Sequence, residues 1–148
     1  MKVAVLMGSP NDKDKMAGAR TMLERFGVEV DERVMSAHRN PADVAAFASA
    51  ARDNGFGAVI CGAGLAAHLA GVVAAHTTLP VIGVPLSGGI AQGLDALLAT
   101  VQMPKGIPVA TVAVDGSANA GILAAEILAV SDKNLADQLA DFKAAGSK

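Results

Sequence analysis

Residues 58–64 read Ala58-Val59-Ile60-Cys61-Gly62-Ala63-Gly64, an uncharged run that passes directly into glycine. Such a run predicts a strand over Ala58 to Cys61, buried on both faces of a sheet, and a turn over Gly62 to Gly64. A similar apolar run, Val3 to Met7, ends at Gly8. Short apolar runs alternate with helical patterns along the chain, which is typical of an α/β domain with a parallel sheet.

The same reading, carried along the chain, predicts five strands joined by helices within a single domain, 1–148. The expected strands are 3–7, 28–35, 58–61, 80–85 and 109–114, and the later helices are 65–75, 93–101, 118–130 and about 132–145. Asn40-Pro41 predicts a helix start, with Asn40 capping the free amides. Right-handed crossovers then give a three-layer αβα sandwich with the flavodoxin-like strand order 2-1-3-4-5. The more polar strand 28–35 is expected at an edge.

The amino-acid composition argues against nucleic acid and membranes as binding partners. The chain has 12 basic and 14 acidic residues, no Trp, no Tyr and four Phe, so neither a basic face nor aromatic platforms for nucleic acid are expected. The segment 54–94 lacks Asp, Glu, Lys and Arg, but histidines and prolines interrupt it before the ~18 apolar residues of a membrane span. A single cysteine, Cys61, and the absence of a signal-peptide pattern indicate the cytoplasm.

Three turns predicted at the carboxyl edge of the sheet carry polar residues. In the order 2-1-3-4-5, the turns after the first three strands are adjacent, at the place where ligands bind in such sheets. These turns hold Gly8 to Asp12, Ser36 to Arg39, and Gly62 to Gly64 with His68 close behind. The sequence therefore predicts a ligand site there.

Each of these residues has two interpretations. Ser9 and the amino end of the helix after it could bind a phosphate, and Asp12 could accept hydrogen bonds from sugar hydroxyls. Alternatively, both residues only form a turn and cap the helix. His38 is either a proton-transferring group or a loop histidine bonded to backbone. Arg39 either binds an anion through its guanidinium or is a solvated surface charge. His68, taken alone, is more often a hydrogen-bonded histidine of the core than a functional residue.

Several motifs in order then carry a family resemblance. They are Gly8-Ser9-x-x-Asp12, Ser36-Ala37-His38-Arg39-x-Pro41, Gly62-Ala63-Gly64-x-Ala66-Ala67-His68-Leu69, residues 79–85, Gly93-Leu94-Asp95, and residues 101–109. Together they resemble the class I N5-carboxyaminoimidazole ribonucleotide mutases of purine biosynthesis. The forms Ala37-His38-Arg39 and Ala66 to Leu69 favour this class over class II, which carboxylates the aminoimidazole directly.

The resemblance implies an isomerase that needs no ATP, biotin or metal. His38 would be the general acid and base for decarboxylation of the N5-linked carbamate and recarboxylation at the ring carbon. The substrate-binding residues it implies are Ser9, Asn11, Asp12, Ser36, Arg39, Gly62, Gly64, Ala67 and His68. Ser9 and Arg39 would hold phosphate, and Asp12 would hold the ribose. The family also forms homo-octamers, which implies active sites near subunit boundaries.

Three positions depart from the family pattern and leave alternatives open. Asn11 stands in place of a serine, Leu65 in place of a glycine, and Ala70 in place of a proline. A paralogous enzyme that moves a carboxyl group on another ribonucleotide is one alternative. A nucleotide-binding protein without catalytic activity is the other.

Overall fold

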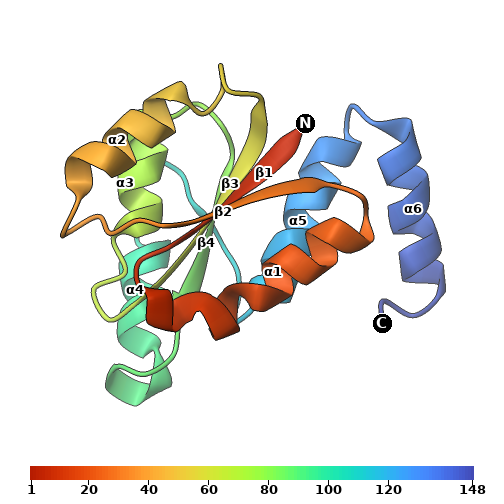
Figure 1. Cartoon of the computed structure of the whole chain (residues 1–148). Coiled ribbons are helices and arrows are strands. Elements are labelled where there is room, and N and C mark those ends of the chain that lie inside the picture. Colours follow the sequence, from red (N-terminus) through yellow and green to blue (C-terminus); the bar gives the residue numbers. More distant parts are fainter.

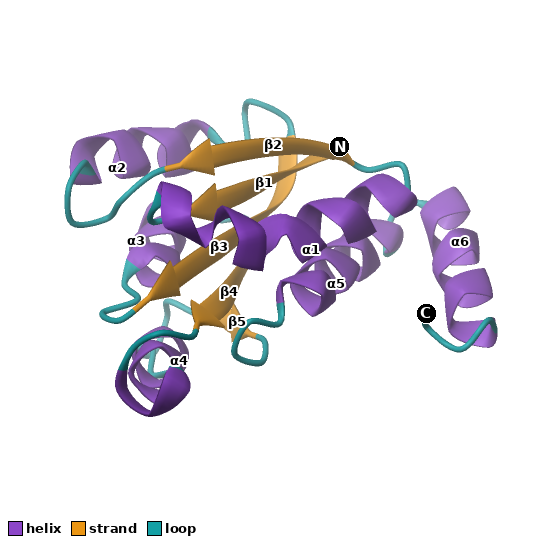
Figure 2. Cartoon of the chain, turned by 60° about the horizontal axis from the view of Figure 1, so that its bottom comes forward, coloured by secondary structure: helices purple, strands orange, loops and turns teal.

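The computed structural model describes all 148 residues and contains one parallel sheet of five strands. The strands run in the order β2-β1-β3-β4-β5, which confirms the predicted flavodoxin-like topology. Figure 2 shows all five strands side by side, pointing the same way. Their bounds are β1 Lys2–Met7, β2 Glu29–Val34, β3 Phe56–Gly64, β4 Val81–Leu86 and β5 Ala110–Thr111.

Helices cover both faces of the sheet and complete the three layers (Figure 1). One face carries α1 (Lys13–Arg25) and α5 (Ser117–Ala129), with α6 (Lys133–Ala144) packed outside α5. The other face carries α2 (Pro41–Ala50), α3 (Leu69–His76) and α4 (Leu94–Val101). Two short 3-10 turns, Pro10–Asp12 and Ile90–Gln92, precede α1 and α4.

The alternation of side chains along β1 explains why two layers of helices form. Val3, Val5 and Met7 are buried in the cluster that includes α1, α5 and α6. Ala4 and Leu6 point to the opposite face and join the cluster under α2 and α3. A central strand covered on both faces is therefore a continuous apolar run, as the sequence indicated.

The polar strand β2 lies at the edge of the sheet, as predicted. None of its residues is fully buried, and it pairs only with β1. Arg33 and Asp31 form an ion pair of 2.8 Å on this strand, and Arg20 on α1 reaches Glu32 at 2.8 Å. Charges along an exposed edge discourage pairing with another chain.

The mostly apolar helix α5 is covered by the chain itself. It packs between α1 and α6, and its one charged residue, Glu126, forms an ion pair of 2.7 Å with Lys143 of α6. Apolar side chains are exposed on α4 instead, where Leu94, Leu98 and Val101 are 46%, 49% and 46% exposed.

The third strand and the following helix differ from the prediction. Residues Gly62 to Gly64 are not a turn but the end of β3, paired with Val84 to Leu86 of β4. The predicted helix 65–75 begins only at Leu69, because Leu65 has a φ of +54°. A left-handed residue cannot belong to a right-handed helix, so the turn lies at 65–68.

The fifth strand is shorter than predicted, with two residues in place of 109–114. Its pairing with β4 continues in separate hydrogen bonds, from Val112 N–H to the Gly83 carbonyl at 3.1 Å and from Asp115 N–H to the Pro85 carbonyl at 2.9 Å. Pro85 has no N–H to donate on the side of β5, so a regular ladder between β4 and β5 cannot pass it. None of the helices combines the length and the apolar character needed to span a bilayer.

Candidate functional site

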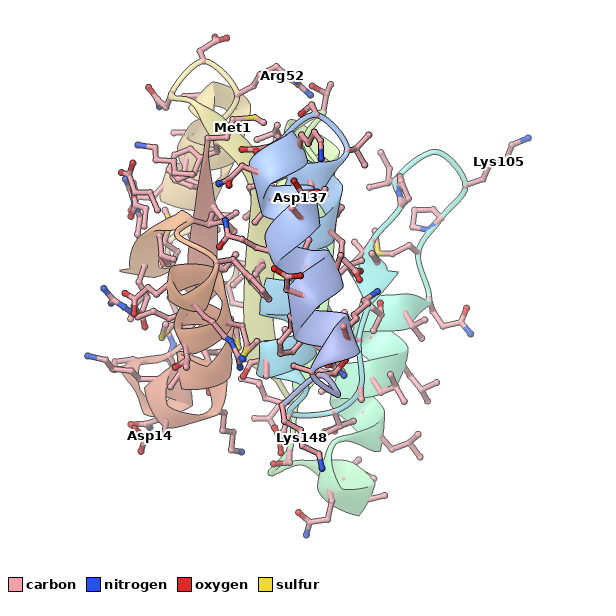
Figure 3. All side chains as sticks on the ribbon, turned by 90° about the vertical axis from the view of Figure 1, so that its right-hand side faces the viewer. Met1, Asp14, Arg52, Lys105, Asp137 and Lys148 are labelled. Atoms are coloured by element: carbon pink, nitrogen blue, oxygen red, sulfur yellow. The ribbon has the colours of Figure 1, made fainter.

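The carboxyl ends of β1, β2 and β3 meet at one edge of the sheet. Backbone bonds tie them together: Gly8 N–H donates to the Gly62 carbonyl at 3.1 Å, and Met35 N–H donates to the Met7 carbonyl at 2.8 Å. Figure 3 shows Asp14, which follows the β1 loop, at the end of the molecule opposite Met1 and Arg52. The three polar loops predicted from the sequence therefore follow strands that end side by side.

The β1 loop holds Ser9, Asn11 and Asp12. Ser9 Oγ accepts a hydrogen bond from Asn11 N–H at 3.2 Å and so caps the 3-10 turn at Pro10–Asp12. The Asp12 carboxylate lies over Gly8, since a methyl group built there would be 3.8 Å from Oδ2. Burial raises the pKa of Asp12, although its hydrogen bond with Ser9 and the charge of Lys15 partly oppose this.

The β2 loop, which carries His38 and Arg39, is closed by two side chains. Asn40 Oδ1 accepts from Ser36 N–H at 2.7 Å, and Ser36 Oγ accepts from Arg39 N–H at 3.2 Å. Asn40 was predicted to cap α2, and this was wrong: its side chain makes no such bond, because it folds back onto the loop. Pro41 at the first helical position has no N–H to be satisfied.

Arg39 is exposed, and its guanidinium makes no hydrogen bond or ion pair within the chain. The guanidinium of Arg52, in contrast, donates to the hydroxyl and the carbonyl of Thr78, and that of Arg25 lies over the ring of Phe142. An unpaired guanidinium at the ligand edge of a parallel sheet is available to an anion.

The end of β3 lies beside these loops and contains two glycines with different surroundings. A Cβ on Gly62 would overlap the buried side chain of Met16 of α1, which would have to shift, so packing favours glycine there. A Cβ on Gly64 would meet only ordinary contacts, the nearest being the Leu86 carbonyl at 3.5 Å. Nothing within the chain demands glycine at 64, which is consistent with close approach of a ligand.

Two histidines from separate loops meet at this edge. His38 Nε2 lies 2.8 Å from His68 Nδ1, and the two rings pack edge to face with centroids 4.8 Å apart. His68 follows Ala67, which is 1% exposed, and precedes α3. The sequence placed both histidines at the site but did not predict that they touch.

Lys15 and Ser87 also reach this edge and were not singled out from the sequence. Lys15 Nζ donates to the Ser87 carbonyl at 2.7 Å and to Ser87 Oγ at 2.9 Å. The two residues lie 72 positions apart, and no local pattern links them. Cys61, in contrast, is buried in β3, and burial raises the pKa of its thiol, so it contributes no thiolate here.

Comparison with known proteins identifies close relatives over nearly the whole chain. A family model described as AIR carboxylase matches residues 2–148. The N5-carboxyaminoimidazole ribonucleotide mutase of Vibrio vulnificus is 50% identical over 145 residues, which cover 97% of this chain and 90% of that protein. The mutase of Saccharolobus solfataricus is 50% identical over 141 residues, covering 95% and 89% respectively.

A solved structure agrees with these sequence matches. The crystal structure of Treponema denticola PurE superposes with a TM-score of 0.86 at 28% sequence identity, covering 98% of this chain and 90% of that one. The similarity therefore extends through all the strands and loops that form the candidate site.

Proposed function

This chain belongs to the AIR carboxylase family, and on that premise we propose that His38 is the general acid and base of its reaction. Its relatives at about half identity are N5-carboxyaminoimidazole ribonucleotide mutases. The chain is accordingly an isomerase of purine biosynthesis. It converts N5-carboxyaminoimidazole ribonucleotide into 4-carboxy-5-aminoimidazole ribonucleotide.

One observation carries the assignment of His38. Its imidazole lies at the ligand edge of the sheet, on a loop that side-chain hydrogen bonds hold in place, within 2.8 Å of a second imidazole. Histidine changes charge near neutral pH, so one ring can protonate the departing nitrogen and later remove the proton from the carboxylated carbon. The same residue serves both halves of the reaction.

The other residues of the edge bind the substrate in this proposal. The unpaired guanidinium of Arg39 and the β1 loop around Ser9 and Asn11 hold the phosphate, where the amides of a helix start favour an anion. Asp12 accepts from the ribose hydroxyls. Ser36, Gly62 and Gly64 shape the floor of the site, and Ala67 and His68 line the part that retains carbon dioxide.

We further propose that the chain assembles into homo-octamers in the cytoplasm. The exposed apolar stripe on α4 supports an interface between subunits, because a large apolar patch on a free surface is unfavourable in water. The lone thiol, Cys61, stays reduced in that compartment.

The direct test uses purified protein and N5-carboxyaminoimidazole ribonucleotide without ATP. We expect the carbon-linked carboxylate to form, followed by its absorbance and by mass spectrometry. Conversion of a different ribonucleotide, with none of this one, would instead favour a paralogous carboxyl-moving enzyme. Binding without any conversion would favour a nucleotide-binding protein that lacks catalysis.

A further inference from the structure

The contact between His38 and His68 constrains where protons can reside. A distance of 2.8 Å between His38 Nε2 and His68 Nδ1 is that of a hydrogen bond, so one proton lies between the two nitrogens. A neutral imidazole has one N–H and one lone pair, and a cationic one has two N–H groups. Both rings cannot be cationic in this geometry, because two N–H groups would then face each other.

Two arrangements remain when both rings are neutral. In the first, His38 donates from Nε2 and His68 accepts at Nδ1, which leaves a lone pair on His38 Nδ1. In the second, His68 donates from Nδ1, so His38 carries its proton on Nδ1 and its only lone pair is occupied. Only the first arrangement leaves His38 able to act as a base, and no group of the chain bonds its Nδ1.

We propose that His68 is a positioning residue that keeps a proton on His38 Nε2, so that Nδ1 alone gives and takes the catalytic proton. This inference rests on the proposed role of His38 as acid and base. A partner on one ring nitrogen fixes the tautomer and the orientation of the other, as in carboxylate–histidine pairs of hydrolases. A single nitrogen then serves both half-reactions without rotation of the ring.

Every proton that His38 gives up in the first half of the reaction is regained in the second. His38 begins as a cation with protons on both nitrogens. Its Nδ1 proton goes to the substrate nitrogen as the bond from that nitrogen to the carboxylate carbon breaks and carbon dioxide leaves. The ring carbon then bonds to carbon dioxide, and Nδ1 removes the hydrogen from that carbon while its electron pair returns to the ring. His68 stays neutral throughout, with its own proton on Nε2.

The position of His68 in the fold suits this role. It occupies the residue before α3 but makes no side-chain hydrogen bond to that helix. Leu69, Ala70 and Val73 anchor the helix in the core, so the backbone under the imidazole is fixed without its help. Replacement of His68 therefore removes the contact to His38 and leaves the packing of α3 in place.

Nuclear magnetic resonance of 15N-histidine protein tests the arrangement directly, because the chain contains three histidines. We expect a nitrogen–nitrogen coupling across the hydrogen bond between His38 Nε2 and His68 Nδ1, with the proton bonded to His38. His76, on the last turn of α3, should show none. Absence of the coupling, or a proton bonded to His68 Nδ1, would overturn the proposal.

Kinetics of two variants provide the second test. His68→Leu removes the acceptor and should lower kcat about tenfold or more with little change in KM. His68→Asn places a carbonyl oxygen near the position of Nδ1 and should restore kcat to within about threefold of wild type. His76→Asn is the matched control and should leave kcat unchanged. Equal losses in both His68 variants would contradict a role through the accepting atom.

The two proposals fail in different ways. A protein that shows the coupling but converts no N5-carboxyaminoimidazole ribonucleotide would overturn the proposed substrate and leave the proton arrangement standing. A protein that converts the substrate but lacks the coupling would overturn the proton arrangement and leave the proposed substrate standing.

Discussion

Lys15 on α1 donates from Nζ to both the carbonyl and the hydroxyl oxygen of Ser87, on the loop after β4. Ser87 N–H in turn donates to Asp115 Oδ1 at 2.9 Å, and Ser117 Oγ donates to the Lys15 carbonyl at 2.6 Å. Three segments that follow different strands are thereby joined across one edge of the sheet. Because Gly64 pairs with Leu86, this junction borders the candidate site.

Replacement of Lys15 by methionine should loosen the junction while keeping the length of the side chain. Hydrogen bonds to a charged group contribute roughly 1.5–3 kcal/mol, and exposure of this one reduces the expected loss of unfolding free energy to about 1 kcal/mol. Urea denaturation at matched protein concentration measures it. Lys13→Met, two residues earlier on α1 and without a side-chain hydrogen bond, is the control, and an equal loss there would contradict a specific role for Lys15.

Replacement of His38 by asparagine tests its proposed role in proton transfer. Asparagine keeps a polar side chain but cannot gain or lose a proton near neutral pH, so kcat should fall by ~10²-fold or more. Product affinity, measured by isothermal titration calorimetry, should stay within a few-fold of wild type. Turnover equal to that of wild type would remove His38 from the mechanism.

The strand order was predicted correctly because it followed from apolar runs and helix periods, which reflect burial directly. Local backbone conformation was harder to predict. The pair of glycines at 62 and 64 suggested a turn, but Gly62 lies in β3 against the side chain of Met16, and that contact is visible only in three dimensions. The turn that begins at Leu65 was not predicted, because leucine rarely adopts a positive φ.

Side-chain contacts between residues far apart in the chain could not be predicted from the sequence, for a different reason. His38 and His68 are 30 positions apart, and the strand order brings their loops together without fixing which atoms touch. The same holds for Lys15 and Ser87. Topology therefore predicted which loops lie at the same edge of the sheet, whereas the partners of each side chain depended on loop geometry.

Removal of the Arg39 guanidinium tests the proposed phosphate site. Arg39→Ala should weaken binding of the ribonucleotide by about tenfold or more, since a charged hydrogen bond contributes roughly 1.5–3 kcal/mol. Binding of the nucleoside without phosphate should change little. Arg52→Ala, at the end of the molecule opposite Asp14, serves as the control (Figure 3). Similar losses for nucleotide and nucleoside would argue against a phosphate contact.

A charge on the exposed face of α4 should disrupt the proposed assembly. Leu94, Leu98 and Val101 share one side of the helix, so Leu98→Glu would place a carboxylate in the middle of an apolar interface. Light scattering at micromolar concentration should give the mass of eight chains for the wild type and a smaller species for the variant. Val130→Glu, at an exposed position beyond α5, should remain assembled. A monomeric wild type would refute the octamer.

Leu65 distinguishes the proposed substrate from the paralogous alternative, because it directly follows the end of β3 at the candidate site. Its φ of +54° is a conformation natural to glycine, and its side chain is 62% exposed. A non-glycine residue there costs roughly 1–2 kcal/mol, but glycine loses more backbone entropy on folding, so Leu65→Gly should change stability by less than about 1 kcal/mol. Any large change in turnover would therefore report on the site.

For an ordinary mutase, Leu65→Gly should leave kcat/KM for N5-carboxyaminoimidazole ribonucleotide within about tenfold, or ~1.4 kcal/mol in the barrier. We expect this result, since Ser9, Asp12, His38 and Arg39 all belong to the motifs on which the family resemblance rests. Ala91→Gly relieves a positive φ of 47° in the 3-10 turn before α4 and controls for strain alone. If wild type were nearly inactive on this substrate and only Leu65→Gly gained activity, Leu65 would instead fit the site to a different ribonucleotide.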